Sequence, residues 1–478
     1  MTLFLAFYKK IIIIVFMGEK IMLENFKKKY VADKYFYTKV AKISVPIALQ
    51  QILNQSASFV DTIMVSRIGA VAAVSVATQL DTLCNTVSFG VNSGASMYSA
   101  QFYGAKDSEG LRKVFGLQLI LNTLNALIFL SIALLFGYQV LHFYSSDQDV
   151  IAVGMQYLRF SCFTYFFSVI TNTYSFIYRS IQKTHIPMYI GISVTLINVL
   201  LNYVFIFGHF GMPKMGAAGA ALATLIATMS GTICHIVYAY FTSQPFIGSF
   251  KEMFYLPIHF VQPIIKRMLP LIVNETLFGF GTSMYIKAYG ILGKSSLEIY
   301  KIGNTVSNFF YIGVQGLNSA TGLVIGEQLG KKRLDVAKQY GSYLVLIAVI
   351  LAFTLTGALY ISAKPLVNLF GLEDPLMYQG AVVMVRLFGL RIATRLFNVI
   401  IMSSLRAGGD SVFLMFLDCG IMWSVGIPLA FISVYYLHVT SLSLLFIIIQ
   451  IEQVTRLIVG FTRYKQGKWI RNLTQETK

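Results

Sequence analysis

The sequence predicts an all-α membrane protein with twelve transmembrane helices, arranged as two six-helix lobes related by a pseudo-twofold axis. Its 478 residues are 56% hydrophobic and only 12% charged, with a mean hydropathy of +0.68, whereas soluble domains have about 25% charged residues. The chain contains twelve apolar stretches of the length, about 20 residues, that a helix needs to cross a bilayer. A half-chain repeat is the third observation.

The second half of the chain repeats the first at a nearly constant spacing. The segment 92–104 returns as 318–330, 226 residues later. Arg179 and Arg406 lie in matching triplets 227 residues apart, and Pro46 precedes Pro270 by 224. Six spans per half is an even number, so matching helices cross the bilayer in the same direction. The pseudo-twofold axis is therefore predicted along the membrane normal, with a site between two lobes that rock against each other.

The predicted elements follow in order along the chain. Residues 1–42 form an N-terminal cytoplasmic segment, of which 1–21 is predicted not to be translated, because its apolar part is short, interrupted by lysines and without a cleavage site. The first lobe is expected at 43–242, a cytoplasmic linker at 243–263, the second lobe at 264–463 and a cytoplasmic tail at 464–478. The spans are expected near 43–66, 70–98, 113–140, 152–178, 186–208, 216–242, 264–290, 297–324, 338–362, 377–403, 411–436 and 440–463.

The linker is expected to be a strap that joins the lobes, because prolines punctuate it. Its aromatic side chains are expected to rest on the membrane interface. They are Phe246, Phe250, Phe254 and Tyr255.

The placement of basic residues predicts the topology, since Lys and Arg of short loops collect on the cytoplasmic side. Every even-numbered connection is basic, whereas the odd-numbered ones carry little positive charge. Both termini are thus expected in the cytoplasm, in the inner membrane of a bacterium. The net charge of +18 is explained by topology, so no nucleic-acid partner is predicted. The basic residues are Lys106, Arg112 and Lys113 after the second span, Arg179 and Lys183 after the fourth, Lys251, Lys266 and Arg267 after the sixth, Lys331, Lys332 and Arg333 after the eighth, Arg406 after the tenth, and Arg463, Lys465, Lys468 and Arg471 after the last.

Several kinds of chemistry are not predicted. The four cysteines have no CxxC spacing and the six histidines form no metal-binding pair, so no metal cofactor or disulfide is expected. The segment 293–295 resembles the end of a phosphate-binding loop, but Ala288 occupies the position of its first glycine. Without an ATPase motif or a catalytic constellation, the chain is not predicted to be an enzyme. Its energy is expected to come from an Na⁺ or H⁺ gradient.

Acidic residues inside predicted spans are candidate functional residues, because an ionised group in the bilayer core costs several kcal/mol. Asp61 in the first span and Glu275 in the seventh are predicted to couple transport to a cation. For Asp81, in the second span, a functional and a structural role are both open. For the two remaining acids structural pairing is favoured, Glu452 with Arg456 one turn away and Asp418 with Arg391 or Arg395.

A Na⁺ site is the most specific hypothesis for the first lobe. Asn198 and Asn202 are four residues apart, on one helical face, and Thr224 lies in the next span. With Asp61 they offer one carboxylate and three neutral oxygens, the hard ligands that Na⁺ prefers. The alternative is that these residues only hold helices together.

A substrate cavity is expected between the lobes, with Arg391 and Arg395 as candidate partners of an anionic substrate group. The 38 Phe and 28 Tyr residues suit adaptable binding of a small organic, amphipathic substrate. The candidate cavity residues are Gln51, Asn274, Arg391, Arg395 and Asp418.

The chain from 43 to 463 resembles bacterial multidrug and toxic compound extrusion (MATE) transporters, close to the NorM and DinF types. The resemblance implies a V-shaped pair of lobes that exports amphipathic, usually cationic compounds in exchange for Na⁺ or H⁺. Asp61 matches the first-helix acid of the family, and Glu275 the seventh-helix Glu of the NorM-like branch. The chain departs from the pattern at Asn202, where members often have Asp, and near Arg395, where a tenth-helix acid is expected. The resemblance rests on Phe59–Val65, Ala100–Lys106, Asn198–Asn202 with Gly216–Thr224, and Leu405–Asp410.

Other functions remain open at this stage. A flippase for a lipid-linked saccharide would need a cationic cavity, which Arg386, Arg391 and Arg395 would partly provide. A non-transporting receptor and a membrane enzyme are less favoured, the latter because no nucleophile or acid pair lies near the interface. The expected partners are a small organic substrate and membrane lipids, and the chain is expected to be a monomer because both lobes form the site.

Overall fold

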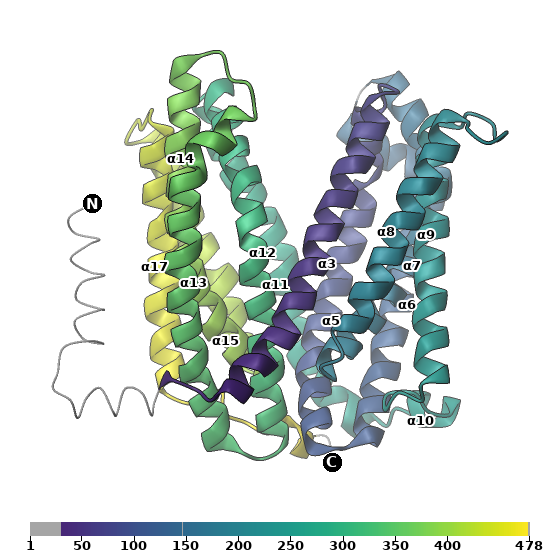
Figure 1. The fold of residues 1–478 in the computed structure, drawn as a ribbon, viewed down its shortest axis with the longest axis vertical. Helices are drawn as coiled ribbons and strands as arrows, with labels where there is room; N and C mark the ends of the chain where they lie inside the picture. The colour runs from purple at the N-terminus through teal and green to yellow at the C-terminus, as the bar shows by residue number, and fades with distance from the viewer. Residues whose placement is uncertain (1–29, 146, 477–478) are drawn as a thin grey trace.

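The computed structural model describes residues 30–145 and 147–476, and in this part the chain is helical with short connections. The helices form two bundles that meet at one end and diverge toward the other (Figure 1). The predicted twelve-span, two-lobe fold is confirmed. Seven of the spans combine membrane-crossing length with high hydropathy by composition; the others have comparable length but carry more polar side chains. The proposed start at Met22 lies outside the described residues.

Each lobe contains six spans. The first lobe consists of α3 (Lys34–Ser66), α4 (Val71–Ala77) with α5 (Gln79–Ala105), α6 (Ser108–Tyr144), α7 (Gln148–Ser180), α8 (His185–Phe207) and α9 (Gly216–Phe241). The second consists of α11 (Ile258–Ile291), α12 (Lys294–Gly330), α13 (Leu334–Asn368), α14 (Pro375–Ala407), the segmented span Ser411–Tyr435 and α17 (Leu442–Lys465). The linker contains α10 (Phe250–Phe254), and the tail contains a 3₁₀ turn, η3 (Leu473–Gln475).

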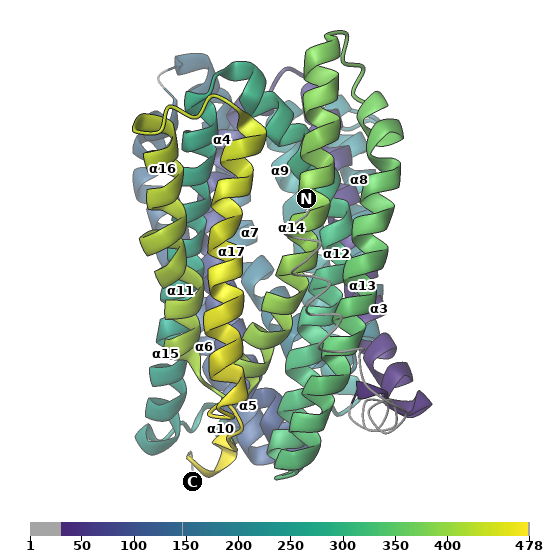
Figure 2. The ribbon, with the colours of Figure 1, turned by 90° about the vertical axis from the view of Figure 1, so that its left-hand side faces the viewer.

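Three of the described spans are less regular than their apolar pattern predicts. In α6 the helix is kinked at Phe136. The second span breaks at Thr78 into α4 and α5. The eleventh consists of α15 (Ser411–Met415), two π-helical turns, η1 (Phe416–Gly420) and η2 (Met422–Gly426), and α16 (Ile427–Tyr435). Figure 2 shows α15 and α16 in one column beside α17. π turns rotate the side chains that follow them and are common at functional positions, and Asp418 lies in the first of the two.

The repeat extends to the local conformation of the backbone. Asp147 and Asp374, 227 residues apart, each cap the helix that follows, and each side chain accepts a backbone hydrogen bond of 2.9 Å. Residues with positive φ also recur at the repeat spacing, in some pairs with the same residue type and in others with different ones. The pairs are Gly69 with Gly293, Lys106 with Lys332, Gln182 with Gly409, and Ser243 with Gly467.

The first helix of each half begins against the opposite lobe. The start of α3 lies on the second lobe, where the Phe36 ring packs 4.7 Å from that of Tyr340, and its far end lies in the first lobe (Figure 1). The start of α11 lies on the first lobe, where the Tyr98 hydroxyl donates to the carbonyl of Pro263 at 3.1 Å. The lobes are therefore interleaved at the end where they meet, here called the closed end.

At the closed end, α5 and α12 cross at two glycines in equivalent positions. A Cβ on Gly104 would lie 2.1 Å from the carbonyl oxygen of Glu327, and a Cβ on Gly330 would lie 1.9 Å from that of Gln101. Gly104 corresponds to Gly330 and Gln101 to Glu327 in the repeat, so each half makes the same contact with the other. Only glycine permits this backbone approach.

The linker crosses the closed end and packs on the first lobe. Arg112 binds Glu252 at 2.9 Å, and Ser249 and Glu252 form a capping box. Hydrogen bonds from Ser249, above all from its backbone N–H, hold the pKa of Glu252 below its ordinary value. Phe250 and Tyr255 are exposed, and their place at the membrane interface stays a prediction. The expectation for Phe246 is wrong, because its ring is buried against other rings of the first lobe, with Phe115 at 4.9 Å.

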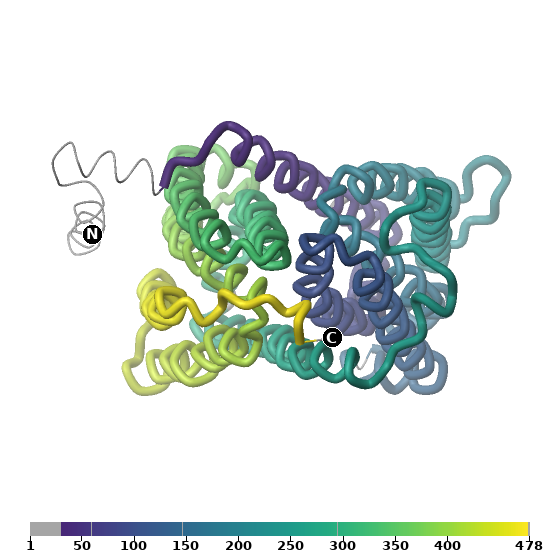
Figure 3. Tube along the Cα trace, turned by 90° about the horizontal axis from the view of Figure 1, so that it is seen from below, coloured from purple at the N-terminus to yellow at the C-terminus, as the bar shows by residue number. Residues whose placement is uncertain are grey.

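The segment after α17 folds back under the seam between the lobes, as Figure 3 shows from the closed end. Gln101 of the first lobe accepts from the backbone N–H of Leu473 at 2.6 Å and donates to the carbonyl of Ala407 at 2.8 Å. Asn472 donates to the carbonyl of Leu329 at 2.9 Å. With Leu473 fully buried, the tail contributes to the packing that joins the two lobes.

Candidate functional site

Three helices of the first lobe bring the predicted cation residues together. Asn202 on α8 donates to Oδ1 of Asp61 on α3 at 2.6 Å and to Oδ1 of Asn198 at 3.2 Å. Asn198 in turn donates to Oγ1 of Thr224 on α9 at 3.2 Å. The four-residue spacing on α8 places both amides on one face, as the sequence predicts.

The environment of Asp61 contains oxygen atoms but no cationic partner among the described residues. Asn202 is 1% exposed, and its buried side-chain oxygen has no hydrogen-bond partner. A buried carbonyl oxygen without a donor is costly, and either a bound cation or a rotated amide would satisfy it. The donor set of one carboxylate, two amides and a hydroxyl suits a hard cation such as Na⁺. Within the described chain, no group of three or more His, Cys, Asp or Glu side chains could hold a metal ion.

A hollow lies beside this cluster, along the C-terminal parts of α3 and α8. It has a volume of about 650 Å³ and is lined mainly by apolar and aromatic side chains. Val60, next to Asp61, is part of its wall. The other lining residues are Ile63, Met64, Arg67, Tyr203, Phe207 and His209.

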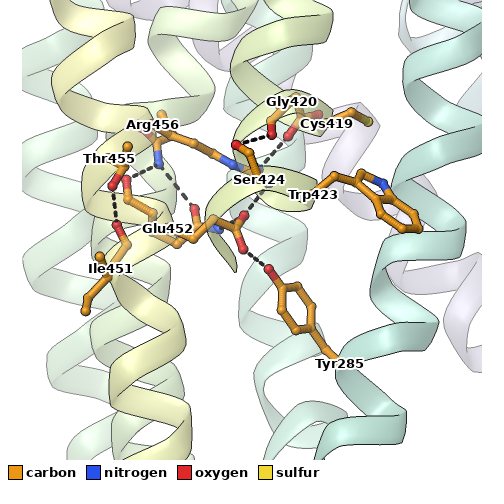
Figure 4. Close-up of polar contacts among 12 residues, drawn as sticks. Tyr285, Cys419, Gly420, Trp423, Ser424, Ile451, Glu452, Thr455 and Arg456 are labelled. Atoms are coloured by element: carbon orange, nitrogen blue, oxygen red, sulfur yellow. Dashed lines mark hydrogen bonds and ion pairs between the residues drawn. The ribbon is translucent and has the colours of Figure 1, made fainter. Parts of the chain in front are cut away.

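In the second lobe, Arg456 joins two acids from different spans. Figure 4 shows one of them, Glu452, between Arg456 and Tyr285. Arg456 forms ion pairs with Glu452, one turn away on α17, and with Asp418 in η1. Tyr285 on α11 donates its hydroxyl to Glu452, and Asn274 donates to Asp418 at 3.1 Å. Glu452 and Arg456 are 2% and 5% exposed and Asp418 is 15% exposed, so the pair of Glu452 with Arg456 is the most deeply buried part of the network.

The expected pairing of Asp418 with Arg391 or Arg395 is wrong. The Arg391 guanidinium lies over the ring of Phe388 at 5.7 Å, and the Arg395 guanidinium lies over the ring of Tyr311 at 4.5 Å. Arg456 occupies the position beside Asp418 instead. The expected pair of Glu452 with Arg456 is present.

We expect Arg456→Met to lower the thermal stability of the protein strongly. It would leave Asp418 and Glu452 buried without a cation, a change that typically costs about 3–5 kcal/mol. The apparent melting temperature of detergent-purified protein would show it. The control is Arg112→Met, which breaks the ion pair with Glu252, where the side chains are 29% and 46% exposed, and should cost less than about 1 kcal/mol. Equal, small shifts in both variants would contradict the structural role of Arg456.

The remaining predicted acids are also bound. Glu275 on α11 pairs with Arg406 on α14 at 3.4 Å. Arg406 also donates to Oγ of Ser93 in the first lobe at 2.7 Å, so it connects Glu275 to the opposite lobe. Asp81 accepts from Asn85, one turn away, at 3.0 Å.

A polar cavity of about 130 Å³ lies between the lobes, where they begin to diverge. The segments that repeat in the sequence line it from both sides. Of the predicted substrate residues Gln51 lines this cavity, whereas Asn274, Arg391, Arg395 and Asp418 are not among its lining residues. Its polar lining residues are Gln51, Ser93, Ser96, Arg179, Ser180, Gln315, Asn318, Ser319, Ser403 and Arg406.

The comparison with known families follows the same division into halves. The sequence model of the MatE family matches residues 46–204 and 270–432, so both lobes match separately and the starts of the matches differ by the repeat spacing. The chain belongs to the MatE family. Its members are transporters, and this MatE protein is therefore a multi-pass membrane transporter of the multidrug efflux type.

Relatives and solved structures agree with the family. The uncharacterized transporter YisQ of Bacillus subtilis is 25% identical over 442 residues, 92% of this chain and 96% of its own. The probable multidrug resistance protein NorM of Streptococcus pneumoniae is 26% identical over 405 residues, 81% and 86% of the two chains. The fold matches that of the MATE transporter VcmN of Vibrio cholerae in its bent form, with a TM-score of 0.81 at 16% identity over 91% and 97% of the chains.

The arginines of the central cavity were missed as site residues of this MatE protein. The sequence predicts cytoplasmic loops at Arg179 and Arg406, because both lie at the ends of their spans. The signal that would have identified them is the repeat itself, since they are charged residues that recur at the same position in both halves.

Proposed function

We propose that this MatE protein is a cation-coupled antiporter that exports amphipathic organic compounds by alternating access. The observation that supports it best is Asp61, a carboxylate within a span that is hydrogen-bonded by Asn202 and has no ion-pair partner in the described part of the chain. Acids in this setting are costly unless they bind a transported ion or proton.

The closed end is assigned to the cytoplasm, because the basic connections lie there. The structure then corresponds to an outward-facing state of a protein in the inner membrane of a bacterium, with both termini in the cytoplasm. The working unit is a monomer, since the cavity receives residues from both lobes.

In the proposed cycle, Na⁺ or H⁺ enters from outside and binds at Asp61, with Asn198, Asn202 and Thr224 as further ligands if the ion is Na⁺. The lobes then rock and the closed end opens, which requires Glu275 and Arg406 to lose their contact with the first lobe. A cytoplasmic substrate binds as the ion leaves. Each charge that moves inward supplies about 2.3 kcal/mol per 100 mV, enough for a concentration ratio of about fifty.

Efflux from proteoliposomes tests the coupling. We expect ethidium or norfloxacin to leave faster when an inward Na⁺ or H⁺ gradient is imposed, each gradient being applied alone with the other ion equal on both sides. Acceleration by only one gradient identifies the ion. Efflux that responds to neither gradient would exclude antiport.

A lipid-linked saccharide flippase is the second candidate, because Arg179 and Arg406 make the central cavity cationic. The arginines expected to provide this charge do not line the cavity: Arg386, for example, lies 4.4 Å over the ring of Tyr360.

A further inference from the structure

Two arginines from equivalent positions of the two halves share one cavity. Arg179 lies near the end of α7 and Arg406 near the end of α14. Both line the central cavity of about 130 Å³, together with hydroxyl and amide side chains from the first and second lobes.

The charge of this cavity is not balanced. Arg406 forms an ion pair with one carboxylate, that of Glu275, at 3.4 Å. Arg179 forms no ion pair with a described residue; its guanidinium donates to the neutral oxygen of Gln50 at 2.8 Å and lies 5.4 Å from the ring of Phe176. No acidic side chain is among the described lining residues. Two guanidinium groups and one carboxylate leave an excess of one positive charge at this depth in the membrane.

The donors of both arginines are also incompletely used. The Nε atoms of Arg179 and Arg406 are buried and have no hydrogen-bond partner. A guanidinium carries five N–H donors in a planar fork, a geometry that matches carboxylate and phosphate oxygens. Buried positive charge with unused donors is expensive unless an anion completes it.

Part of the wall around the arginines is apolar. It includes the aromatic rings of Phe89 and Phe176 and the side chains of Ile47, Met97 and Leu323. At about 130 Å³ the cavity is smaller than the roughly 300–1,000 Å³ of a site that encloses a drug-sized ligand, so it would hold the charged end of an amphipathic molecule and only the adjoining part of its apolar body.

We infer that the central cavity binds the oxyanion of an amphipathic molecule, a carboxylate or a phosphate, with Arg179 and Arg406 as its cationic partners. The inference rests on the proposed export function and narrows its substrate class to zwitterions and anions. A compound that is only cationic would meet an excess of positive charge here. The carboxylate at Asp61 is not part of the lining of this cavity and remains available for the coupling ion.

Binding to purified protein in lipid nanodiscs tests the inference without any ion gradient. One arm compares norfloxacin, which carries a carboxylate, with its ethyl ester. A second arm compares dodecyl phosphate with dodecanol, and so represents a lipid phosphate. We expect the wild type to bind at least one oxyanion about tenfold more tightly than its neutral-ended partner. The arm that shows the difference distinguishes a soluble carboxylate from a lipid phosphate.

The variants locate the binding. Arg179→Gln should remove the preference for the oxyanion, Arg179→Lys should keep part of it, and Arg406→Gln should act like Arg179→Gln. The matched control is Arg386→Gln, since Arg386 packs on Tyr360 away from the cavity, and it should change neither Kd by more than about twofold.

Two results would overturn the inference. One is that neither oxyanion binds the wild type more tightly than its partner. The other is that Arg179→Gln weakens the ester and dodecanol as much as the oxyanions. The two proposals fail in different experiments. If the proposed antiport is wrong, efflux from proteoliposomes does not depend on either gradient, whereas the preference for the oxyanion in the nanodisc binding assay is unchanged.

Discussion

Asp61→Asn is expected to abolish ion-driven efflux while leaving the protein folded. Asparagine has nearly the same shape and can keep a hydrogen bond with Asn202, so the helix contacts between α3 and α8 survive. It cannot carry the negative charge that holds Na⁺ or H⁺. Each charge that moves inward supplies about 2.3 kcal/mol per 100 mV, which supports a substrate concentration ratio of about fifty. The variant loses this driving force. The measurement is gradient-driven norfloxacin efflux from proteoliposomes.

Asp81→Asn is the matched control for this prediction. Asp81 is also an acid within a span of the first lobe, but it is hydrogen-bonded to Asn85 on its own helix and is not part of the Asp61 cluster. We expect its replacement to leave gradient-driven efflux within about a factor of two to three of the wild type. If Asp61→Asn kept the wild-type response to the gradient that drives efflux, Asp61 could not be the coupling residue.

Gly330→Ala is expected to open the closed end. Its Cβ would lie 1.9 Å from the carbonyl oxygen of Gln101, so α5 and α12 must move apart. Overpacking of this kind costs about 1–3 kcal/mol, and here the cost falls only on the state in which the helices cross. The population should therefore shift about 5- to 150-fold toward the other state. Spin labels on the exposed, symmetry-related Lys106 and Lys332 would report a longer distance by pulsed electron resonance, with the native cysteines replaced.

The chain offers both a control and a replicate for this change. Gly322, on the same helix, has open space where its Cβ would be, and Gly322→Ala should leave the distance unchanged. Gly104→Ala, the equivalent position of the first half, should act like Gly330→Ala. An unchanged distance in both variants would show that the glycine contact does not control the closed end.

The number and order of the spans were predictable because crossing a bilayer imposes length and apolarity on each helix. The interleaving of α3 and α11 with the opposite lobes was not. It depends on contacts such as that of Phe36 with Tyr340, which join residues about 300 positions apart and leave no periodic signal. The packing of the C-terminal segment on the seam between the lobes is not predictable for the same reason. A basic, polar segment after the last span predicts only a cytoplasmic tail.

Within the candidate sites, local spacing was the reliable signal. The cluster of Asp61 with Asn202 and the pair of Glu452 with Arg456 follow from residues one helical turn apart and from the shared packing of neighbouring spans. The prediction for the partner of Asp418 is wrong. Arg391, Arg395 and Arg456 are equally basic, and only side-chain packing determines that Arg456 is the one that contacts Asp418. The aromatic neighbours of Arg391 and Arg395 hold them elsewhere.

The seam closed by Gln101, Asn472 and Leu473 also bears on the biogenesis of the protein. The segment that fills it follows α17 in the chain, so it can reach its place only after α17 and the spans before it have been synthesised. Until then Gln101 lacks its partners at Leu473 and at the carbonyl of Arg471. A newly inserted bundle must therefore pass through a stage in which the cytoplasmic junction is unsealed, and completion of the barrier is the last step of its assembly.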